Sequence, residues 1–536
     1  MNENKLKIIL ITGMSGIRIE YSLQKFISNF RDFRTSRRKK PELIKLDTEI
    51  ENVFYKENPL VRKSNQVWKD VILKKSYPVF KKLWESALEQ VMLKLDAIIK
   101  ENKSDVVLIN LHSCYYHNKT QEYVSLLNLN SLSRLNPSMV VTFIDDIYDI
   151  HQRLTDTGGI FHDETNVTNT QMILRLFRLL DWRAKEIMIS KFISQHLNVK
   201  NYIFAVKHSF ETLSNLIFED FPVVYLSHPI TEVRRLEKQN RLDEASKIMG
   251  EITQISDRLT GLFTTFLPTT IDEYRITSKT SSDGVHKDYY SVLQKRWESE
   301  QYINPKDFLY INSGFTDTNE LWKKDVSEIG KLDEQINHLL DALSAYISDQ
   351  VTTRDYSLVE QSDILVIYRP IFNGNASGGV REEFRYYKRL KEDTAKEILC
   401  FVYCPRIDIE KYFIKQFELK ILNEIKSTNN LVCRESEFSN LTTEECSNLL
   451  NATSNKLLLL DVFDEVLDNH KIDITIRNEK TPLGENAITE FKHDFVEQLK
   501  KNYESIGEYK SSVTYYEESE ITIEEFINRI KTQTKN

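Results

Sequence analysis

The residues best suited to chemistry lie between positions 351 and 390, where acidic side chains flank a glycine loop. Arg354 and Asp355 form a charged pair, and Asp363 follows shortly after them. The next five residues, Ile364–Tyr368, are apolar and rich in β-branched side chains, which predicts a buried strand. A carboxylate near the carboxyl end of such a strand can act as a nucleophile or stabilise a positive charge.

A glycine loop follows this predicted strand. It reads, in order, Ser377-Gly378-Gly379-Val380. We expect a helix to begin near Arg381, with Glu382 and Glu383 in its first turn. A strand that leads into a glycine loop and a helix N-terminus forms an anion site, because amides and the helix dipole both attract negative charge. The alternative is a capped helix start with surface acids.

This arrangement resembles the nucleoside 2-deoxyribosyltransferase family, and in particular its 2'-deoxynucleoside 5'-monophosphate N-glycosidase branch. That branch has an Arg-Asp pair, a further aspartate, a strand and a Ser-x-Gly-Val-x-x-Glu loop, which the stretch above matches. A second element, Val223–Thr231, resembles the family's first strand and nucleobase loop, with Tyr225 at the position of the strand tyrosine. The resemblance covers about residues 221–405.

The resemblance implies a role for three residues in cleaving the bond between a sugar and a base. Glu383 is implied as the nucleophile, because cleavage creates positive charge at the anomeric carbon. Asp355 is implied as the group that serves the departing base, and Tyr225 as the residue that orients Glu383 or the sugar. Glu382 is the rival nucleophile if the register shifts by one residue.

The resemblance also implies a set of substrate-binding residues. Ser377 and the amides after it are expected to hold a 5'-phosphate, and two residues of the nucleobase loop are expected near the base. Asp363 belongs to the set, although a structural role at the start of its strand is an equal alternative. The full set is Ser377, Gly378, Gly379, Val380, Ser227, His228 and Asp363.

Two features differ from the family pattern. The helix after the loop continues with the bulky run Phe384-Arg385-Tyr386-Tyr387, where small residues are usual. The segment between Tyr225 and Arg354 is longer than the family core needs. These features predict a substrate larger than a plain deoxynucleoside, or an altered site.

A degenerate phosphate-binding loop follows the first predicted strand, Lys7–Thr12. A P-loop reads G-x-x-x-x-G-K-[ST], and its lysine and hydroxyl serve the phosphates and Mg²⁺. The residues that keep the pattern are Gly13, Ser15 and Gly16. Arg18 replaces the last glycine, Ile19 the lysine, and Glu20 the serine or threonine. The loop has therefore lost the groups that a phosphate needs most.

About residues 5–205 resemble the P-loop nucleoside-monophosphate kinases, especially the archaeal adenylate kinase type. The matching places are the glycine loop, the strand Asp105–Leu111 with His112 after it, and the strand Met139–Ile144 with Arg153 on the next helix. Because Ile19 replaces the lysine, we expect a pseudo-kinase. The alternatives are a kinase with an unusual phosphate grip and an unrelated Rossmann-like layer.

The length of 536 residues predicts about three domains. Alternating strands and helices predict an α/β fold, with two doubly wound parallel-sheet (Rossmann-like) domains and a mixed, mainly helical C-terminal region. The expected domains are a degenerate P-loop kinase-like domain at 1–210, a nucleoside deoxyribosyltransferase-like domain at 221–405 and an accessory region at 406–536. In the last region we expect helices near 408–426 and 488–504 and a strand at Lys456–Leu460.

Charge and cysteine content exclude some classes of protein. A net charge of -8 and a pI near 5.9 do not indicate a nucleic-acid binder. Five irregularly spaced cysteines predict reduced thiols and a cytoplasmic protein, with no metal site. We expect no signal peptide, since Lys7–Thr12 has the pattern of a strand, and no membrane contact, since no run approaches the ~20 apolar residues of a spanning helix.

The resemblance of residues 221–405 implies an N-glycosidase, either a hydrolase or a transferase, that cleaves the base–sugar bond of a nucleotide, a dinucleotide such as NAD, or a nucleoside. No cofactor is expected. The expected partners are that substrate, a regulatory protein and further copies of the chain in a homo-oligomer. By analogy of fold, the activity could serve as a regulated antiphage effector. The alternative is a catalytically inactive nucleotide-binding sensor or scaffold.

Overall fold

The chain folds into two compact units, Met1–Asp220 with Pro268–Gln361, and Phe221–Leu267 with Ser362–Asn536. The computed structural model describes residues 6–30, 39–61, 63, 67–117, 120, 122–156, 161, 169–219, 221–238, 241–271, 326–372, 375–394, 399–405, 408, 431–432, 475–476, 514–517 and 522–534. The elements expected at 408–426, 456–460 and 488–504 lie outside these ranges, apart from Asp408.

The two units divide the chain differently from the expected 221–405 domain, because the described residues 268–271 and 326–361 belong to the first unit. Helix α14, Val326–Glu360, packs on α7, Asn169–Leu197. Gln361 then exchanges two hydrogen bonds with the backbone of Ile203, at 2.9 and 3.2 Å. Helical periodicity is local, so it does not reveal which core a helix joins.

The expected C-terminal region is also not separate, because its described part belongs to the second unit. Strand β16, Thr514–Glu517, pairs in parallel with β13, Cys400–Cys404, and extends the sheet of that unit. Helix α20, Ile523–Gln533, packs its apolar residues against the same sheet. A short antiparallel pair, β14 (Leu431–Val432) and β15 (Thr475–Ile476), is also described there.

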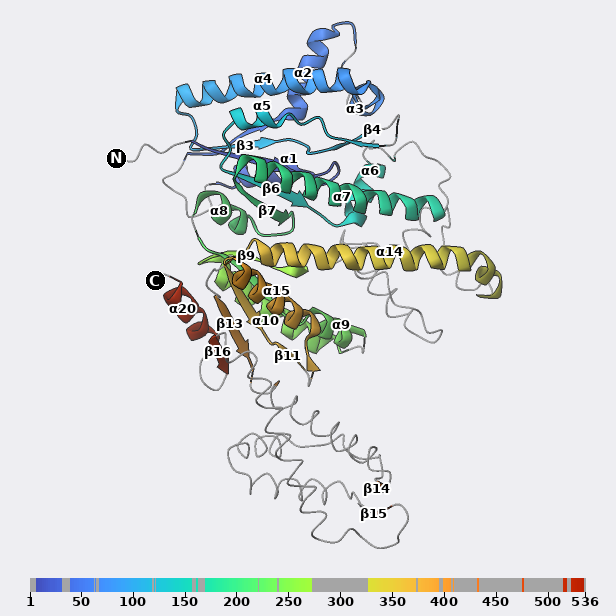
Figure 1. Ribbon diagram of the computed structural model, residues 1–536, viewed down its shortest axis with the longest axis vertical. Helices are drawn as coiled ribbons and strands as arrows, with labels where there is room; N and C mark the ends of the chain where they lie inside the picture. The colour runs from blue at the N-terminus through green and yellow to red at the C-terminus, as the bar shows by residue number, and fades with distance from the viewer. Residues whose placement is uncertain are drawn as a thin grey trace. The chain divides into compact units, whose positions relative to one another are not determined.

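Five described strands form the parallel sheet of the first unit, in the order β2-β3-β1-β6-β7 (Figure 1). The apolar runs of the three central strands, β3, β1 and β6, are typical of strands that are buried on both faces. The strands are β1 Lys7–Thr12, β2 Glu42–Lys45, β3 Val106–Asn110, β6 Met139–Ile144 and β7 Lys200–Ala205. An antiparallel pair, β4 Tyr115–His117 and β5 Glu122–Val124, follows β3.

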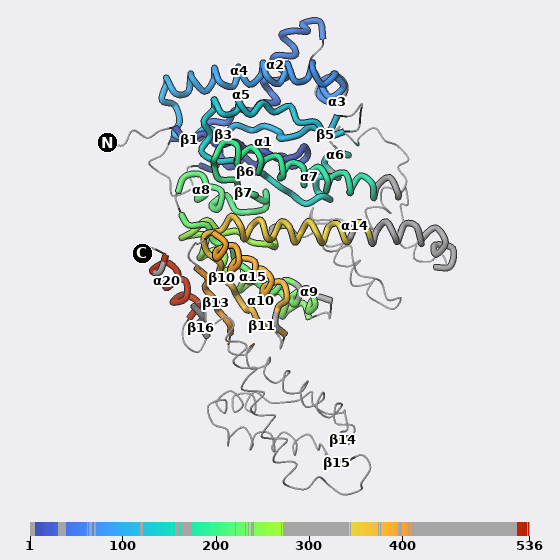
Figure 2. The backbone as a smooth tube through the Cα atoms, in the orientation of Figure 1, coloured from blue at the N-terminus to red at the C-terminus, as the bar shows by residue number. Residues whose placement is uncertain are grey.

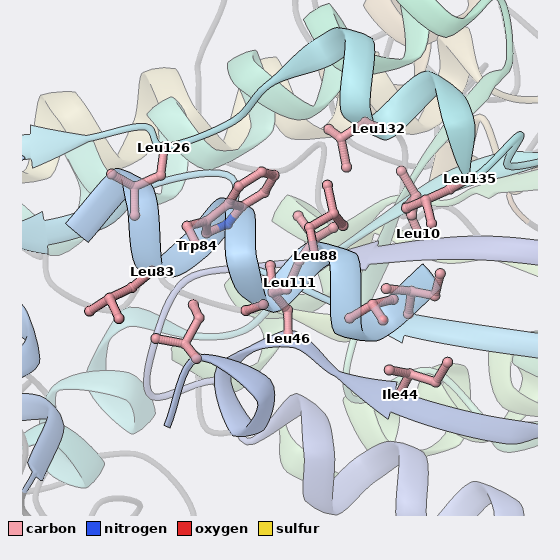
Figure 3. Packing of buried hydrophobic residues seen from close by; sticks show 14 of the residues in the cluster. Leu10, Ile44, Leu46, Leu83, Trp84, Leu88, Leu111, Leu126, Leu132 and Leu135 are labelled. Carbon is pink, nitrogen blue, oxygen red and sulfur yellow. The ribbon is translucent and has the colours of Figure 1, made fainter. Parts of the chain in front are cut away.

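Helices cover this sheet and supply its core. The helices named so far are joined by α1 Ile19–Ser28, α2 Leu46–Glu57, α3 Val67–Asp70, η2 Ile72–Lys74, α4 Tyr77–Glu101, α5 Leu129–Arg134, α6 Ile147–Asp156, α8 Phe210–Phe218 and η3 Pro268–Thr270. Figure 3 shows Trp84 and Leu88 of α4 packed with Leu10 of β1, Ile44 of β2 and Leu132 of α5. Burial of these side chains is the main force that holds the helices on the sheet.

Five described strands form a second parallel sheet in the second unit, in the order β16-β13-β10-β8-β9. The strands not yet bounded are β8 Val223–Ser227, β9 Thr264–Phe266 and β10 Ile364–Tyr368. After β10 comes a small antiparallel pair, β11 Ile371–Phe372 and β12 Asn375–Ala376. The predicted α/β class, with parallel sheets flanked by helices, is confirmed in both units.

Each face of the second sheet has its own helices. One face is covered by α9, Ile230–Lys238, and α10, Leu242–Thr260, which lie side by side (Figure 2). Both helices share a core with Val224 and Leu226 of β8. Successive strand residues point to opposite faces. Tyr225 and Ser227 therefore face away from α10, toward α15, which spans Gly378–Asp393.

Helix α15 begins three residues before the predicted start at Arg381. The Ser377 carbonyl accepts a hydrogen bond from the Arg381 amide at 3.1 Å, so the first helical turn contains Gly378 and Gly379. Glycine has low helix propensity, but tertiary packing overrides propensity at a helix start. Glu383 consequently lies in the second turn of the helix, not in the first.

None of the helices in the described ranges combines the length and the apolar composition that a bilayer crossing needs.

Candidate functional site

The strand order of the second unit creates a place for a ligand. After β8 the chain crosses to β9 on one side, and later returns to β10 on the other side of β8. In open α/β sheets ligands bind outside the carboxyl ends of the strands where this direction reverses. Ser227 ends β8 and Tyr368 ends β10, so the loops after these two residues border the expected site.

A buried carboxylate lies on the sheet beside this switch point. Glu383 of α15 is only 9% exposed. The Tyr225 hydroxyl donates to Glu383 Oε1 at 2.8 Å, and the Ser227 hydroxyl donates to Oε2. Burying a carboxylate is costly unless it is hydrogen-bonded. The two hydroxyls therefore allow Glu383 to lie inside the unit and hold its carboxylate in one orientation.

The register of the helix separates Glu383 from its neighbour Glu382. The Glu382 side chain is 50% exposed and pairs with Arg385 at 3.0 Å along the outer surface of α15. Consecutive residues of a helix point about 100° apart, so the two glutamates cannot both face the sheet. The structure thus brings Glu383, and not Glu382, to the strand tyrosine.

The bulky helix that departs from the family pattern has a structural explanation. Tyr387 is fully buried, and its hydroxyl donates to the carbonyls of Asp363 and Leu399 at 2.7 and 3.2 Å. Phe384 is buried as well. These side chains fix α15 on the sheet, and they leave the position of Glu383 intact.

Gly378 and Gly379 are exposed at the start of α15, and Ser377 before them is buried. The amide of Ser377 donates to the Pro370 carbonyl at 2.9 Å, which anchors the loop, while its side chain makes no capping hydrogen bond. A Cβ atom at Gly378 or Gly379 would meet no described atom within 4 Å. Packing does not require glycine at either position, so the amides stay open to an approaching anion. Val380 is buried, so its side chain fixes the first turn of α15 in the core of the unit.

Asp363 lies at the other end of β8. Its Oδ2 accepts from the Val223 amide at 2.9 Å, and its own amide donates to the Val223 carbonyl at 2.8 Å. Because Val223 begins β8 and Ser227 ends it, the Asp363 carboxylate is not brought to Glu383. This placement corrects the substrate-binding role expected for Asp363 and matches the structural alternative. His228 follows Ser227 at the carboxyl end and is buried.

Arg354 and Asp355 belong to the first unit and lie inside α14. Arg354 donates to the carbonyls of Ile271 and Pro268 at 2.9 and 3.1 Å, and to Asp355 Oδ1 at 2.9 and 3.0 Å. The pair therefore ties the segment after β9 to α14, and the role of Asp355 toward a base stays a prediction.

The degenerate P-loop forms a pocket in the first unit. Gly13 and Gly16 have φ angles of 154° and 89°, and Arg18 has a left-handed φ of 58° as the N-cap of α1. A Cβ at Gly13 would lie 2.7 Å from the Phe143 carbonyl oxygen, so only glycine fits there. The pocket has a volume of 480 Å³, and Ser15 is part of its lining.

A charged histidine lies on the floor of this pocket. His112 Nδ1 donates to the Gly13 carbonyl, and Nε2 lies 3.2 Å from Asp47 Oδ2. Burial opposes the charge of His112, but Asp47 and Glu186 outweigh burial and raise its pKa to about 9. Asp47 also accepts from the Tyr115 hydroxyl at 2.9 Å. The sequence signal for this pair was its place just after β2 and β3, at the carboxyl edge of the sheet.

A second carboxylate accepts hydrogen bonds from backbone amides, including the Gly13 amide of the degenerate loop. Glu186 of α7 is buried, and its oxygens accept from the amides of Gly13, Ser113 and Cys114 at 2.9, 2.7 and 3.0 Å. Burial raises the pKa of Glu186, while His112 and these amides oppose the rise. The Gly13 amide is therefore not free for a phosphate. Helical periodicity alone did not point to Glu186, which looked like an ordinary helix residue.

Across the described residues, no group of three or more His, Cys, Asp or Glu side chains is arranged to hold a metal ion. Comparison with known proteins finds no family model and no curated protein that matches the chain. The fold and the sites define an α/β protein with a hydroxyl-held carboxylate in one unit and an altered phosphate loop in the other.

Proposed function

We propose that the second unit is an N-glycosidase that cleaves the base–sugar bond of a nucleotide or dinucleotide, in the manner of the nucleoside 2-deoxyribosyltransferase family. The observation that carries the proposal is the Glu383 carboxylate, buried at the switch-point end of the sheet between the Tyr225 and Ser227 hydroxyls. An ordinary surface glutamate of a helix would need neither bond.

Glu383 can attack while both hydroxyls stay in place. Each carboxylate oxygen has two lone pairs, so one pair can accept the hydroxyl proton while the other approaches the anomeric carbon. In the proposed first step the new bond forms from a Glu383 oxygen to that carbon, and the base leaves with the electrons of the glycosidic bond. Water, or a second base, then breaks the enzyme–sugar ester and releases Glu383.

The base needs a proton or a hydrogen bond as it leaves. The family resemblance implies Asp355 for this role, and we keep that role as a proposal that rests on the resemblance alone. An Asp355→Asn variant tests the role independently of Glu383.

The open helix start favours a substrate with a 5'-phosphate. Ser377 and the uncovered amides of Gly378 and Gly379 combine hydrogen-bond donors with the positive end of the α15 dipole. A nucleotide or dinucleotide should thus be preferred over a free nucleoside.

The direct test is release of free base from NAD, deoxynucleoside monophosphates, deoxynucleoside triphosphates and nucleosides, measured by chromatography. We expect Glu383→Gln to abolish release and the matched control Glu382→Gln to retain it, with both variants folded. Tyr225→Phe should lower the rate about tenfold to a hundredfold, because one hydrogen bond to a charged group is typically worth 1.5–3 kcal/mol. Full activity of Glu383→Gln would remove the assignment from this site.

A second candidate is a nucleotide-binding sensor or scaffold without turnover. The observation that favours it is the first unit, where Ile19 replaces the lysine and Glu186 occupies the Gly13 amide. Binding of nucleotides with no base release from any of them would support the sensor.

A further inference from the structure

The 480 Å³ pocket of the first unit has the size of a small-ligand site. It lies where β1 and β3 end, and the strand order reverses around β1, since β2 and β3 lie on one side and β6 and β7 on the other. The glycosidase proposal makes no use of this pocket. Its lining residues are Met14, Ser15, Gly16, Arg18, Ile19, Glu20, Tyr21, Gln24, Asp47, Asn110 and His112.

Asn110 gives the pocket an unused recognition group. It is the last residue of β3, it is 8% exposed, and it lines the pocket. Its buried Oδ1 accepts no hydrogen bond from any residue that the structure describes. Buried side-chain acceptors are nearly always paired, so an unpaired one calls for a partner. A ligand in the pocket can supply that donor.

The charges of the pocket are already balanced by protein groups. Glu20 pairs with Lys45 at 2.6 Å, and His112 pairs with Asp47 at 3.2 Å. These cations are therefore already engaged by protein carboxylates, and the Gly13 amide already donates to a buried Glu186. The pocket therefore favours a ligand of low net charge over a nucleoside triphosphate.

An aromatic side chain at the pocket indicates a planar ligand. Tyr21 of α1 lines the pocket and is 62% exposed, so its ring is accessible to a ligand. Arg18, also exposed, lines the same pocket. Tyrosine rings and arginine guanidinium planes both stack on the faces of nucleobases.

We propose that this pocket binds a nucleobase, or a nucleoside without phosphates. The Asn110 carboxamide presents a donor and an acceptor side by side, the pattern that pairs with the edge of a base such as adenine. Tyr21 and Arg18 supply planes for the base face, and the paired charges around His112 tolerate a neutral ligand. The site is separate from Glu383 and stands whether or not the second unit is a glycosidase.

The test uses the full chain carrying Glu383→Gln, which prevents turnover of the added ligands. Calorimetric titrations with adenine, guanine, cytosine, thymine and their nucleosides are compared with titrations of the matching mono- and triphosphates. We expect saturable binding of at least one base or nucleoside at a site that Asn110→Leu weakens. Absence of binding by every base and nucleoside at millimolar concentration would overturn the proposal, as would a triphosphate that binds more tightly than its base and loses that affinity in Asn110→Leu.

Variants locate the binding site. Asn110→Leu should weaken the affinity for the base about tenfold or more, which is the usual effect of losing a pair of hydrogen bonds to one base. Tyr21→Ala, a change at an exposed position that folding tolerates, should weaken it by a similar or smaller factor. Asn52→Leu on the exposed surface of α2 is a control that should leave affinity unchanged. Equal affinity of the parent protein and both Tyr21→Ala and Asn110→Leu would contradict the site.

Discussion

Two buried carboxylates behave differently because different donors hold them. Glu383 accepts from side-chain hydroxyls of Tyr225 and Ser227, and hydroxyl protons can rotate as a substrate arrives. Glu186 accepts from three backbone amides of Gly13, Ser113 and Cys114, which are fixed by the loops that carry them. The first arrangement suits a reacting group, whereas the second suits a structural anion.

Ser377 is expected to recognise a phosphate. Ser377→Ala should weaken cleavage of a nucleotide about tenfold to more than a hundredfold, since a hydrogen bond to a charged group is typically worth 1.5–3 kcal/mol. Cleavage of the matching nucleoside should hardly change. Stability should also be retained, because the hydroxyl makes no capping bond. The measurement is kcat/KM for both substrates, and an equal loss for both would remove the phosphate role.

His112 is expected to make stability depend on pH. Its pKa is about 9 in the folded chain, against an ordinary value of 6.5. A raised folded pKa gives a stabilising contribution that is complete below pH 6.5 and is lost as the pH rises through 9. The free energy of unfolding should therefore fall over that interval, by at most about 3 kcal/mol.

Urea denaturation at a series of pH values measures this effect. His112→Gln should flatten the decline, while His196→Gln, a change of an exposed histidine near the end of α7, should leave it in place. An unchanged slope in His112→Gln would show that His112 is not the titrating group.

Among elements, α14 shows how a single residue can determine which core a helix joins. The helix carries Arg354, whose guanidinium reaches the carbonyls of Pro268 and Ile271 and thereby closes the segment that follows β9 onto the helix. Arg354 is buried, so each of these bonds is made away from water. Helix α15 is fixed on its sheet in a comparable way by Tyr387.

Replacing Arg354 should therefore destabilise the first unit. Arg354→Leu removes the ion pair with Asp355 and the hydrogen bonds to the carbonyls of Pro268 and Ile271, so we expect a loss of about 2–4 kcal/mol. The control Arg389→Leu alters a side chain that is 83% exposed and should change stability by less than about 0.5 kcal/mol. Chemical denaturation measures both variants. Equal stability of the two would show that the Arg354 contacts contribute little.

At the scale of the whole chain, each unit has its own sheet and its own switch point, and the two sites differ in kind. In the first unit, the amide and the carbonyl of Gly13 in the loop after β1 are bonded to Glu186 and His112. The second unit keeps an open helix start and a buried carboxylate. A division of labour between a ligand-binding unit and a reactive unit follows from the two proposals together.

The first unit is accordingly expected to transfer no phosphoryl group. The chain has Ile19 in place of the lysine that offsets charge on the β- and γ-phosphates. Incubation with ATP, Mg²⁺ and a panel of nucleoside monophosphates should give transfer no greater than background. Magnesium-dependent transfer that disappears in Gly13→Val, where a side chain would strike the Phe143 carbonyl, would contradict the pseudo-kinase reading.

Local patterns in the sequence predicted the first and last residues of several strands. Strands β1, β6 and β10 begin and end where their apolar runs predict, because a strand buried on both faces must be apolar along its whole length. The family resemblance implied that Tyr225 lies close to Glu383. Alternate residues of a strand point to the same face, which explains why the Ser227 hydroxyl also donates to Glu383.

Only the tertiary structure decided which residues share a core or a pocket. It assigned 268–361 to the first unit, moved Asp363 away from Glu383, and brought Asp47, Asn110 and His112 to one pocket. Periodicity reports which face of an element is apolar, and it carries no information on which distant element covers that face. Convergence of side chains from separate strands depends on sheet order and register, and these are set by long-range packing.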